Sequence, residues 1–177
     1  MSNIVYIATS LDGYIADKNE GLDWLHSVPN PDGSDFGFAE FMDRIDALVM
    51  GRNTFDMVRS FDCDWPYPKP VFVMSNSMTS VPVGFEDKIT LVNGPLQDIV
   101  ADLNSKGFNN LYIDGGITVQ NFLKEDLIDE MIITTIPVLL GGGLPLFGDL
   151  VSPLNFKLKK SEVLIGAIVK SHYVRVK

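Results

Sequence analysis

A glycine pair that directly follows a short apolar segment is the feature of this sequence best suited to chemistry. Residues 111–123 read LYIDGGITVQNFL, so an apolar strand candidate leads through Gly115 and Gly116 into a segment of helical period. Glycine lets the main chain approach a ligand closely, and the first turn of a helix presents unpaired N–H groups and the positive end of its dipole. The segment is therefore a candidate for binding phosphate through main-chain amides, and the alternative is an ordinary tight turn.

A second strand candidate, residues 47–50, also ends in groups that suit an anion. They lie at the start of a helix candidate and are Gly51, Arg52, Asn53 and Thr54. A positive charge at a helix N-terminus is unfavourable, because the helix dipole is positive there. The position of Arg52 is easier to explain if its guanidinium faces the phosphate of a ligand. The alternative is a surface ion pair, for example with Asp56.

Small polar side chains follow a third strand candidate, residues 71–74. Ser75, Asn76 and Ser77 can cap a helix or bond phosphate oxygens, and capping is the commoner use of such residues. The carboxyl ends of parallel strands meet at one edge of a sheet, where ligands bind. If the three segments converge there, they favour a long ligand with several phosphates.

The elements that must position these residues alternate between strand and helix along most of the chain. The strand candidates are residues 4–8, 47–50, 71–74, 89–92, 111–113, 131–136, 156–163 and 167–176. The helix candidates are residues 36–45, 54–61, 96–105 and 118–124. Continuous apolar runs are typical of strands buried on both faces, and Gly166 between the last two strands indicates a hairpin. The sequence thus predicts a single mixed α/β domain over residues 1–177, with a mostly parallel central sheet, flanking helices and a C-terminal antiparallel hairpin.

Composition narrows the possible partners. The formal net charge of −9 argues against nucleic acid and anionic membrane surfaces, because both require a basic face. Cys63 is the only cysteine, and His26 and His172 are isolated in the sequence, so we expect neither a disulfide nor a metal site. The chain opens without a basic and apolar leader, and no apolar run approaches the roughly 20 residues of a membrane span, so we expect a cytoplasmic location.

The three anion segments also carry a resemblance. VMGRNTFD, VFVMSNS and YIDGGITVQNFL, in this order and at these separations, resemble the dihydrofolate reductase superfamily. SLDGYIA at residues 10–16 and PVLLGGGLPLF at residues 137–147 look more like the reductase domain of the bifunctional riboflavin-biosynthesis deaminase-reductases and its stand-alone relatives. The resemblance covers nearly the whole chain and implies a reductase that uses NADPH.

The resemblance also implies roles for individual residues. The residues expected to bind NADPH are Ala8, Gly51, Arg52, Asn53, Thr54, Ser75, Asn76, Ser77, Asp114, Gly115, Gly116, Ile117, Thr118 and Val119. Ala8 would lie near the nicotinamide, and Arg52 with the serines would hold the 2′-phosphate. No acidic residue follows residues 71–74 to take a free ribose 2′-hydroxyl, which agrees with NADPH rather than NADH.

A carboxylate is needed to protonate or orient a substrate whose C=N bond accepts a hydride. Asp35 matches the position of the pterin-binding acid of dihydrofolate reductases, and it is our candidate catalytic and substrate-binding residue. Thr134 matches a threonine bonded to that acid, and Trp24 a tryptophan beside the mobile substrate loop. The simpler alternatives are a helix cap for Asp35, a core or loop anchor for Trp24 and an ordinary strand residue for Thr134.

The resemblance therefore implies an NADPH-dependent reductase of a pyrimidine or pterin-like substrate. 5-Amino-6-(5-phosphoribosylamino)uracil is the first choice, dihydrofolate is the second, and a non-catalytic NADPH-binding module is the alternative outside the enzyme class. The first substrate carries a phosphate, and the basic residues that could hold it by charge are Arg44, Arg59, Lys18 and Lys69. The apolar segment at residues 139–147 is expected to fold over a site, or to form the interface of a homodimer like that of the riboflavin relatives.

Overall fold

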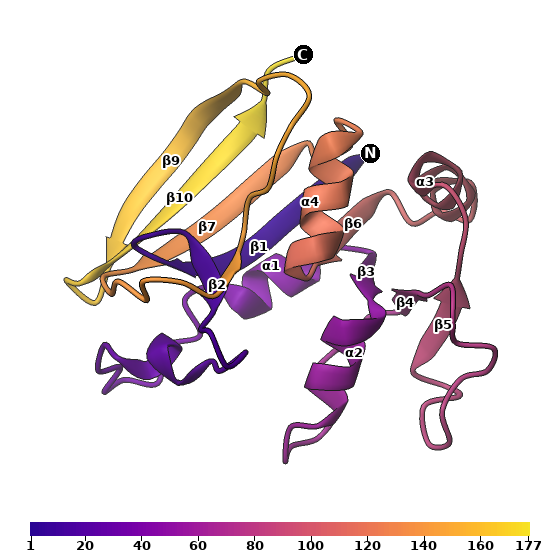
Figure 1. Cartoon of the computed structure of the whole chain (residues 1–177), viewed down its shortest axis with the longest axis horizontal. Coiled ribbons are helices and arrows are strands. Elements are labelled where there is room, and N and C mark those ends of the chain that lie inside the picture. Colours follow the sequence, from indigo (N-terminus) through magenta and orange to yellow (C-terminus); the bar gives the residue numbers. More distant parts are fainter.

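A mostly parallel eight-stranded sheet forms the centre of the computed structural model, which describes residues 1–177. Its strand order is β5-β4-β3-β6-β1-β7-β10-β9 (Figure 1). The strands are β1 (Ser2–Ser10), β3 (Ala47–Gly51), β4 (Val71–Met74), β5 (Ile89–Val92), β6 (Asn110–Asp114), β7 (Glu130–Ile136), β9 (Phe156–Leu164) and β10 (Ile168–Arg175). A separate two-stranded sheet pairs β2 (Tyr14–Ala16) with β8 (Leu144–Pro145).

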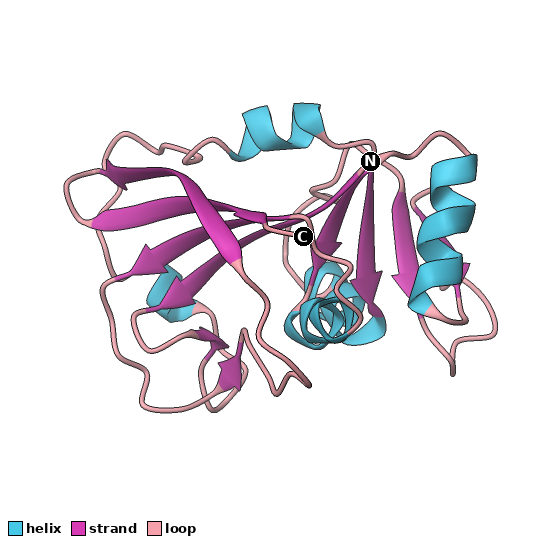
Figure 2. Ribbon diagram, turned by 90° about the horizontal axis from the view of Figure 1, so that it is seen from above, coloured by secondary structure: helices cyan, strands magenta, loops and turns pink.

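Helices cover both faces of the large sheet (Figure 2). They are the 3-10 helix η1 (Asp23–His26) and the α-helices α1 (Phe38–Arg44), α2 (Arg52–Arg59), α3 (Leu96–Ser105) and α4 (Gly116–Lys124). Phe41 of α1 and Phe55 of α2 belong to the hydrophobic cluster on one face. Leu103 of α3 and Phe122 of α4 belong to the cluster on the other face. Both faces of the central strands are therefore buried, as their continuous apolar runs predicted.

The three candidate anion segments lie at one edge of the sheet. Strand β3 pairs in parallel with β4 on one side and with β6 on the other. Met50 is in register with Val73 and with Asp114, so the segments that follow these strands leave the sheet side by side. The expectation that they converge is confirmed, as are the mixed α/β class and the mostly parallel sheet.

The C-terminal part of the sheet is antiparallel. Strand β10 pairs antiparallel with both β7 and β9. Ile165 and Gly166 form the turn of the β9–β10 hairpin, with φ of 47° and 67°. Positive φ at both central positions is the geometry that tight hairpins require, so the predicted hairpin is confirmed.

Several element boundaries differ from those predicted. Helix α1 begins at Phe38 rather than Phe36, because Phe36 and Gly37 have φ of 54° and 87°, outside the helical region. Helix α2 begins at Arg52 rather than Thr54. The segment at residues 139–147 contains β8, which was not predicted because this strand is only two residues long. None of the helices is both long and apolar enough to cross a membrane.

Candidate active site

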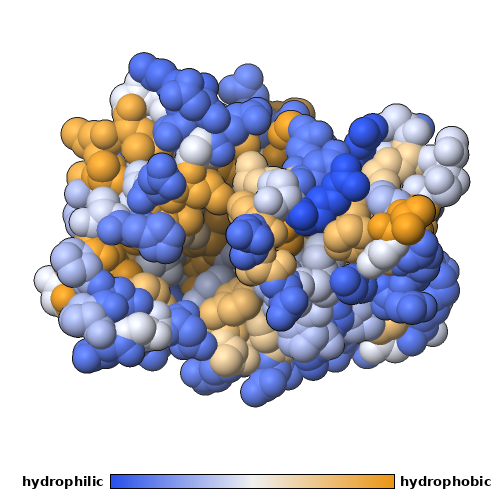
Figure 3. All heavy atoms as spheres, turned by 90° about the horizontal axis from the view of Figure 1, so that it is seen from below, coloured by the Kyte–Doolittle hydropathy of each residue, from blue (hydrophilic) through white to orange (hydrophobic).

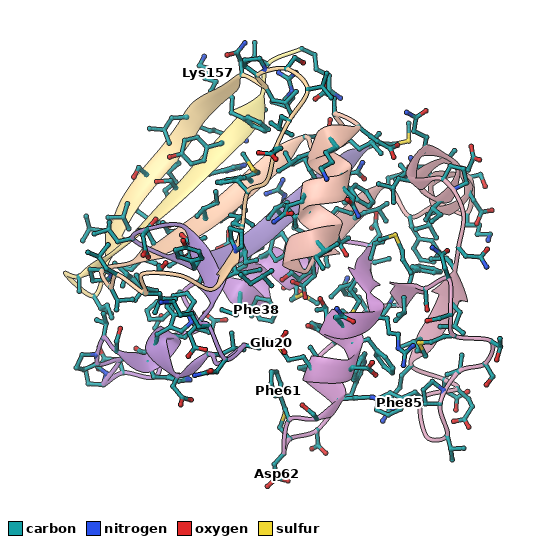
Figure 4. The ribbon with its side chains drawn as sticks, in the orientation of Figure 1. Glu20, Phe38, Phe61, Asp62, Phe85 and Lys157 are labelled. Carbon is teal, nitrogen blue, oxygen red and sulfur yellow. The ribbon has the colours of Figure 1, made fainter.

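A cleft of about 1060 Å³ lies at the carboxyl edge of the sheet. Nine of the residues expected to bind NADPH line it: Gly51, Arg52, Asn53, Thr54, Ser75, Asn76, Gly116, Ile117 and Thr118. On the opposite side, Glu20 and Leu144 line it, and Glu20 lies on the side of its loop that faces α2 (Figure 4). This volume is slightly above the usual range for ligand pockets, roughly 300–1,000 Å³, so an extended ligand fits.

The start of α4 provides free amides for an anion. The first bond of the helix runs from the Val119 amide to the Gly115 carbonyl at 2.9 Å. The amides of Gly116, Ile117 and Thr118 therefore have no partner within the helix. They point out of its N-terminus, where the helix dipole also favours negative charge.

Only glycine fits at position 115 beside this helix start. Gly115 has a φ of 93°, and a Cβ there would lie 2.2 Å from the Oγ1 atom of Thr54. The backbone that begins α4 is thus packed against the side chain that begins α2. This close approach joins two of the three anion segments into one surface.

Arg52 is held by two polar neighbours at the start of α2. Its Nε atom donates to Asp56 at 3.2 Å, so the ion pair considered as the alternative is present. Its Nη1 atom donates to the Ser77 hydroxyl at 2.9 Å, which links the second anion segment to the third. Arg52 is the only lysine or arginine that lines the cleft, and these contacts fix its position before any ligand binds.

Ser75 is used within its own loop. Its hydroxyl accepts the amides of Ser77 at 3.2 Å and Met78 at 3.0 Å. Ser75 therefore bonds amides of its own loop and caps no helix, because no helix lies between β4 and β5. Asn76 lines the cleft and is exposed, so its side chain remains available to a ligand.

Five of the residues expected to bind the cofactor do not line the cleft: Ala8, Ser77, Asp114, Gly115 and Val119. Val119 is fully buried and its amide is bonded within α4, so the structure argues against direct contact between Val119 and a ligand. Asp114 does not line the cleft. Since side chains alternate along β6, Asp114 lies on the same face as Tyr112, the face that α1 covers.

The Asp114 carboxyl lacks a positively charged partner. Its Oδ1 atom accepts the Gly115 amide at 2.8 Å, and its Oδ2 atom lies 3.4 Å from the Tyr67 hydroxyl. Burial is the main reason why the pKa of Asp114 is raised, and the hydrogen bonds only partly offset it. The sequence pattern does not predict this raised pKa, because Asp114 falls within the segment expected to bind phosphate.

Asp35 acts as a cap at the start of α1. Its two carboxylate oxygens accept the amides of Gly37 and Ala39, each at 2.9 Å. The amide of Ala39 is the strongest reason why the pKa of Asp35 is lowered, followed by that of Gly37. Asp35 is exposed, and its carboxylate keeps its charge near neutral pH.

The expected bond between Asp35 and Thr134 is not formed. Both oxygens of Asp35 bond main-chain amides, and Thr134 is a buried residue of β7. Thr134 is in register with Ala8 of β1 and with Lys170 of β10, so these residues form one row across the sheet. Trp24 is buried beside this region, and its indole Nε1 atom has no hydrogen-bond partner.

Two of the four basic residues considered for a substrate phosphate are paired with acids. Arg44 pairs with Glu130 at 2.6 Å and Arg59 with Asp56 at 2.8 Å. Lys18 packs against Gly142.

Lys170 was missed, because a lysine in a strand of alternating polarity reads as a solvent-facing residue. Its Nζ atom donates to the Phe36 carbonyl at 2.8 Å and pairs with Glu162 at 3.0 Å. Its charge also helps to lower the pKa of Asp35. Lys170 lines a second, smaller cavity of about 210 Å³ that lies between α1 and strands β7, β9 and β10.

The segment at residues 139–147 is tied to the loop after β1. Asp12 accepts the amides of Leu140 at 3.1 Å and Gly141 at 2.8 Å. Gly143 passes so close to the Ala16 carbonyl that no Cβ would fit there. Together with the β2–β8 pairing, these contacts hold Leu144 at the wall of the cleft.

Comparisons with known proteins identify the family of the chain. Residues 3–170 match the family described as the RibD C-terminal domain. The Bacillus subtilis (strain 168) protein YwjB is 37% identical over 175 residues, which is 97% of each chain. A candidate riboflavin biosynthesis protein from Shewanella sp. PV-4 has a crystal structure with 68% identity and a TM-score of 0.98, and the match covers 100% of both chains.

More distant structures show the fold alone. The Thermotoga maritima deaminase/5-amino-6-(5-phosphoribosylamino)uracil reductase has a TM-score of 0.74 at 17% identity, and 99% of this chain spans 56% of that one. Dihydrofolate reductase from Enterococcus faecalis, solved with NADP(H), has a TM-score of 0.66 at 14% identity, with 99% and 97% of the chains covered. From its family match and its close relatives, the chain belongs to the RibD C-terminal domain family, whose members are typically reductases of dihydrofolate reductase-like fold.

Proposed function

We propose that this protein is an NADPH-dependent reductase that delivers a hydride to a C=N centre of a pyrimidine or pterin-like substrate. The first candidate substrate is 5-amino-6-(5-phosphoribosylamino)uracil. The single observation that carries the proposal is the cleft, because all three anion segments found in the sequence line it together. Membership of the RibD C-terminal domain family supports the same reading.

The groups in the cleft suit a phosphorylated dinucleotide. The free amides at the start of α4 would hold the pyrophosphate, and Arg52 with Ser77 would hold the 2′-phosphate. Ala8, which is in register with Thr134, would lie next to the nicotinamide. When bound, the cofactor supplies the hydride, and the protein must supply the proton and the orientation.

Asp35 would orient the substrate by accepting hydrogen bonds. The bonds from two main-chain amides lower the pKa of Asp35 and keep its carboxylate ionised.

Turnover assays test the proposal. Purified protein is mixed with NADPH and either the phosphoribosylaminouracil or dihydrofolate, and the nicotinamide absorbance is followed. We expect oxidation of NADPH with the uracil derivative. Oxidation with dihydrofolate alone would favour the second substrate, and binding of NADPH without turnover of either would favour a non-catalytic binding module.

We further propose that the chain forms a homodimer in the cytoplasm. Seen from below, hydrophobic residues gather on the side of the molecule where the β9–β10 hairpin lies, beside a hollow (Figure 3). Large exposed hydrophobic residues of the hairpin and of the segment before it include Leu139, Phe147, Leu158 and Val163. Light scattering during gel filtration should give twice the monomer mass of 19.6 kDa, and the monomer mass would refute the dimer.

A further inference from the structure

The second cavity, of about 210 Å³, is separate from the cofactor cleft and has a basic lining of its own. It lies between α1 and the strands β7, β10 and β9, which are neighbours at one end of the sheet (Figure 1). No residue lines both the cavity and the cleft. Four basic side chains face the cavity: Arg44 of α1, Lys160 of β9, and Lys170 and His172 of β10.

Two of these bases share one carboxylate. Lys160 and Lys170 pair with the two oxygens of Glu162, at 2.8 Å and 3.0 Å. Lys170 also donates to the Phe36 carbonyl at 2.8 Å, and its side chain is only 18% exposed. Because an ammonium has three N–H donors, both lysines keep donors that no group of the protein accepts.

The other two bases share a second carboxylate. Arg44 Nη2 and His172 Nε2 lie against the same oxygen of Glu130, at 2.6 Å and 2.7 Å. The side chains of His172 and Glu130 are 16% and 14% exposed, so this pair is largely buried. Arg44 uses only one of its five N–H donors in this bond, and the other ring nitrogen of His172 has no partner.

The β9–β10 pairing brings the two groups of bases together. Lys170 is in register with Glu162, and His172 is in register with Lys160. Lys170 and His172 are two positions apart in β10, so they lie on the same face, about 7 Å apart along the strand. Arg44 reaches the same space from α1. Unused donors from a helix and two strands therefore converge on one small cavity.

A phosphate group suits this cavity. Its volume is below the roughly 300–1,000 Å³ of pockets that enclose a whole small molecule, so it fits an ion or one group of a larger ligand. Donors that come from several sides require several acceptors, and a phosphate offers at least three oxygens, whereas a carboxylate offers two. Glu40 is the one acid of the lining without an ion pair, and it is exposed, so water screens its repulsion of an anion.

We propose that this cavity is a binding site for a phosphate group, either inorganic phosphate or the phosphate of a small monoester. The planar guanidinium of Arg44 would bond two phosphate oxygens, and the lysines and His172 would bond the others. The inference does not rest on the proposed reductase activity, because the cavity shares no residue with the cofactor cleft.

NMR of the histidine side chains tests the proposal, because the chain contains only two histidines. Inorganic phosphate and glycerol 3-phosphate are titrated separately into ¹⁵N-labelled protein at fixed pH, with chloride at equal ionic strength as the control. We expect both phosphates to shift the His172 signals saturably and to leave those of His26, in η1, unchanged. A lower Kd for glycerol 3-phosphate would identify a phosphate monoester as the ligand, and an equal or higher Kd would identify the free ion.

Substitutions in and beside the cavity complete the test. Lys160→Gln should raise the Kd about two- to five-fold without loss of the fold, because this side chain is 65% exposed, and Lys170→Gln should raise it about ten-fold or more. Glu40→Gln should lower the Kd. Lys159→Gln is the matched control, since it removes a charge from the same strand outside the cavity. Absence of a saturable His172 shift, an equal shift with chloride, or an equal rise in Kd in Lys159→Gln and Lys160→Gln would overturn the inference.

Discussion

Replacing Arg52 by alanine should convert the cleft from one that prefers NADPH to one that binds NADPH and NADH alike. The two cofactors differ only in the 2′-phosphate, so a residue that bonds this group must affect NADPH alone. Arg52 is the only basic residue lining the cleft, and it is already held by Asp56 and Ser77. Its loss should therefore remove most of the preference for the extra phosphate.

The size of the effect follows from the surroundings of the guanidinium. A hydrogen bond to a charged partner contributes about 1.5–3 kcal/mol. The Arg52 side chain is 49% exposed and shares its charge with Asp56, so the lower half of that range applies. A loss of about 1.5–2 kcal/mol corresponds to a roughly 10- to 30-fold rise in Kd for NADPH.

Isothermal titration calorimetry with both reduced cofactors measures this effect. The Kd for NADH should change less than about two-fold, because the rest of the cradle is intact. Arg59→Ala is the matched control, since Arg59 pairs with the same Asp56 at 2.8 Å but does not line the cleft. Equal weakening of NADPH and NADH in Arg52→Ala, or the same loss of discrimination in Arg59→Ala, would refute the assignment.

Three further predictions concern the backbone and the two acids. Gly115→Ala should lower the melting temperature more than Gly107→Ala, because φ is positive at both sites but only at Gly115 would a Cβ strike Thr54, and equal losses would show that the contact is unimportant. Asp35→Asn should lower the melting temperature less than Asp35→Ala, because the one oxygen of asparagine can still accept one of the two main-chain amides, and both variants should raise the KM of the substrate; wild-type KM in Asp35→Asn would exclude the substrate role. Because the pKa of Asp114 is raised in the folded protein, the wild type should lose stability as the pH rises from the ordinary aspartate pKa to the raised pKa. Asp114→Asn has no such carboxyl, so its melting temperature relative to the wild type should increase over this pH range. A difference that stays constant with pH would contradict the raised pKa.

Much of the fold could be predicted because the pattern and the packing agree. Continuous apolar runs gave the buried strands, and the turn at Ile165 and Gly166 gave the hairpin. The start of α1 was wrong by two residues, since the side chain of Asp35 binds the first amides while Phe36 has a positive φ. The spacing of apolar residues alone does not reveal the residue at which a helix begins, because this depends on the backbone angles and on the capping side chain.

The anion segments could be predicted for a similar reason, because each combines local sequence with a strand end. The contacts of Asp114 could not, since Tyr67 lies 47 positions away and reaches it only through the folded loop. The same holds for Lys170, which the β7–β10 pairing places beside Thr134. Local patterns predicted which segments meet at the edge of the sheet, whereas the contacts and the pKa of an acid depend on tertiary structure.

Calorimetric titration of the purified protein with NADPH is the most direct test of the central claim, that a phosphorylated dinucleotide occupies the cleft between α2 and α4. The account predicts saturable binding with one site per chain, and weaker binding of NADH. If neither NADPH nor NADH gives a heat of binding, the proposed cofactor, the proposed reaction and the roles of the cleft residues are all contradicted.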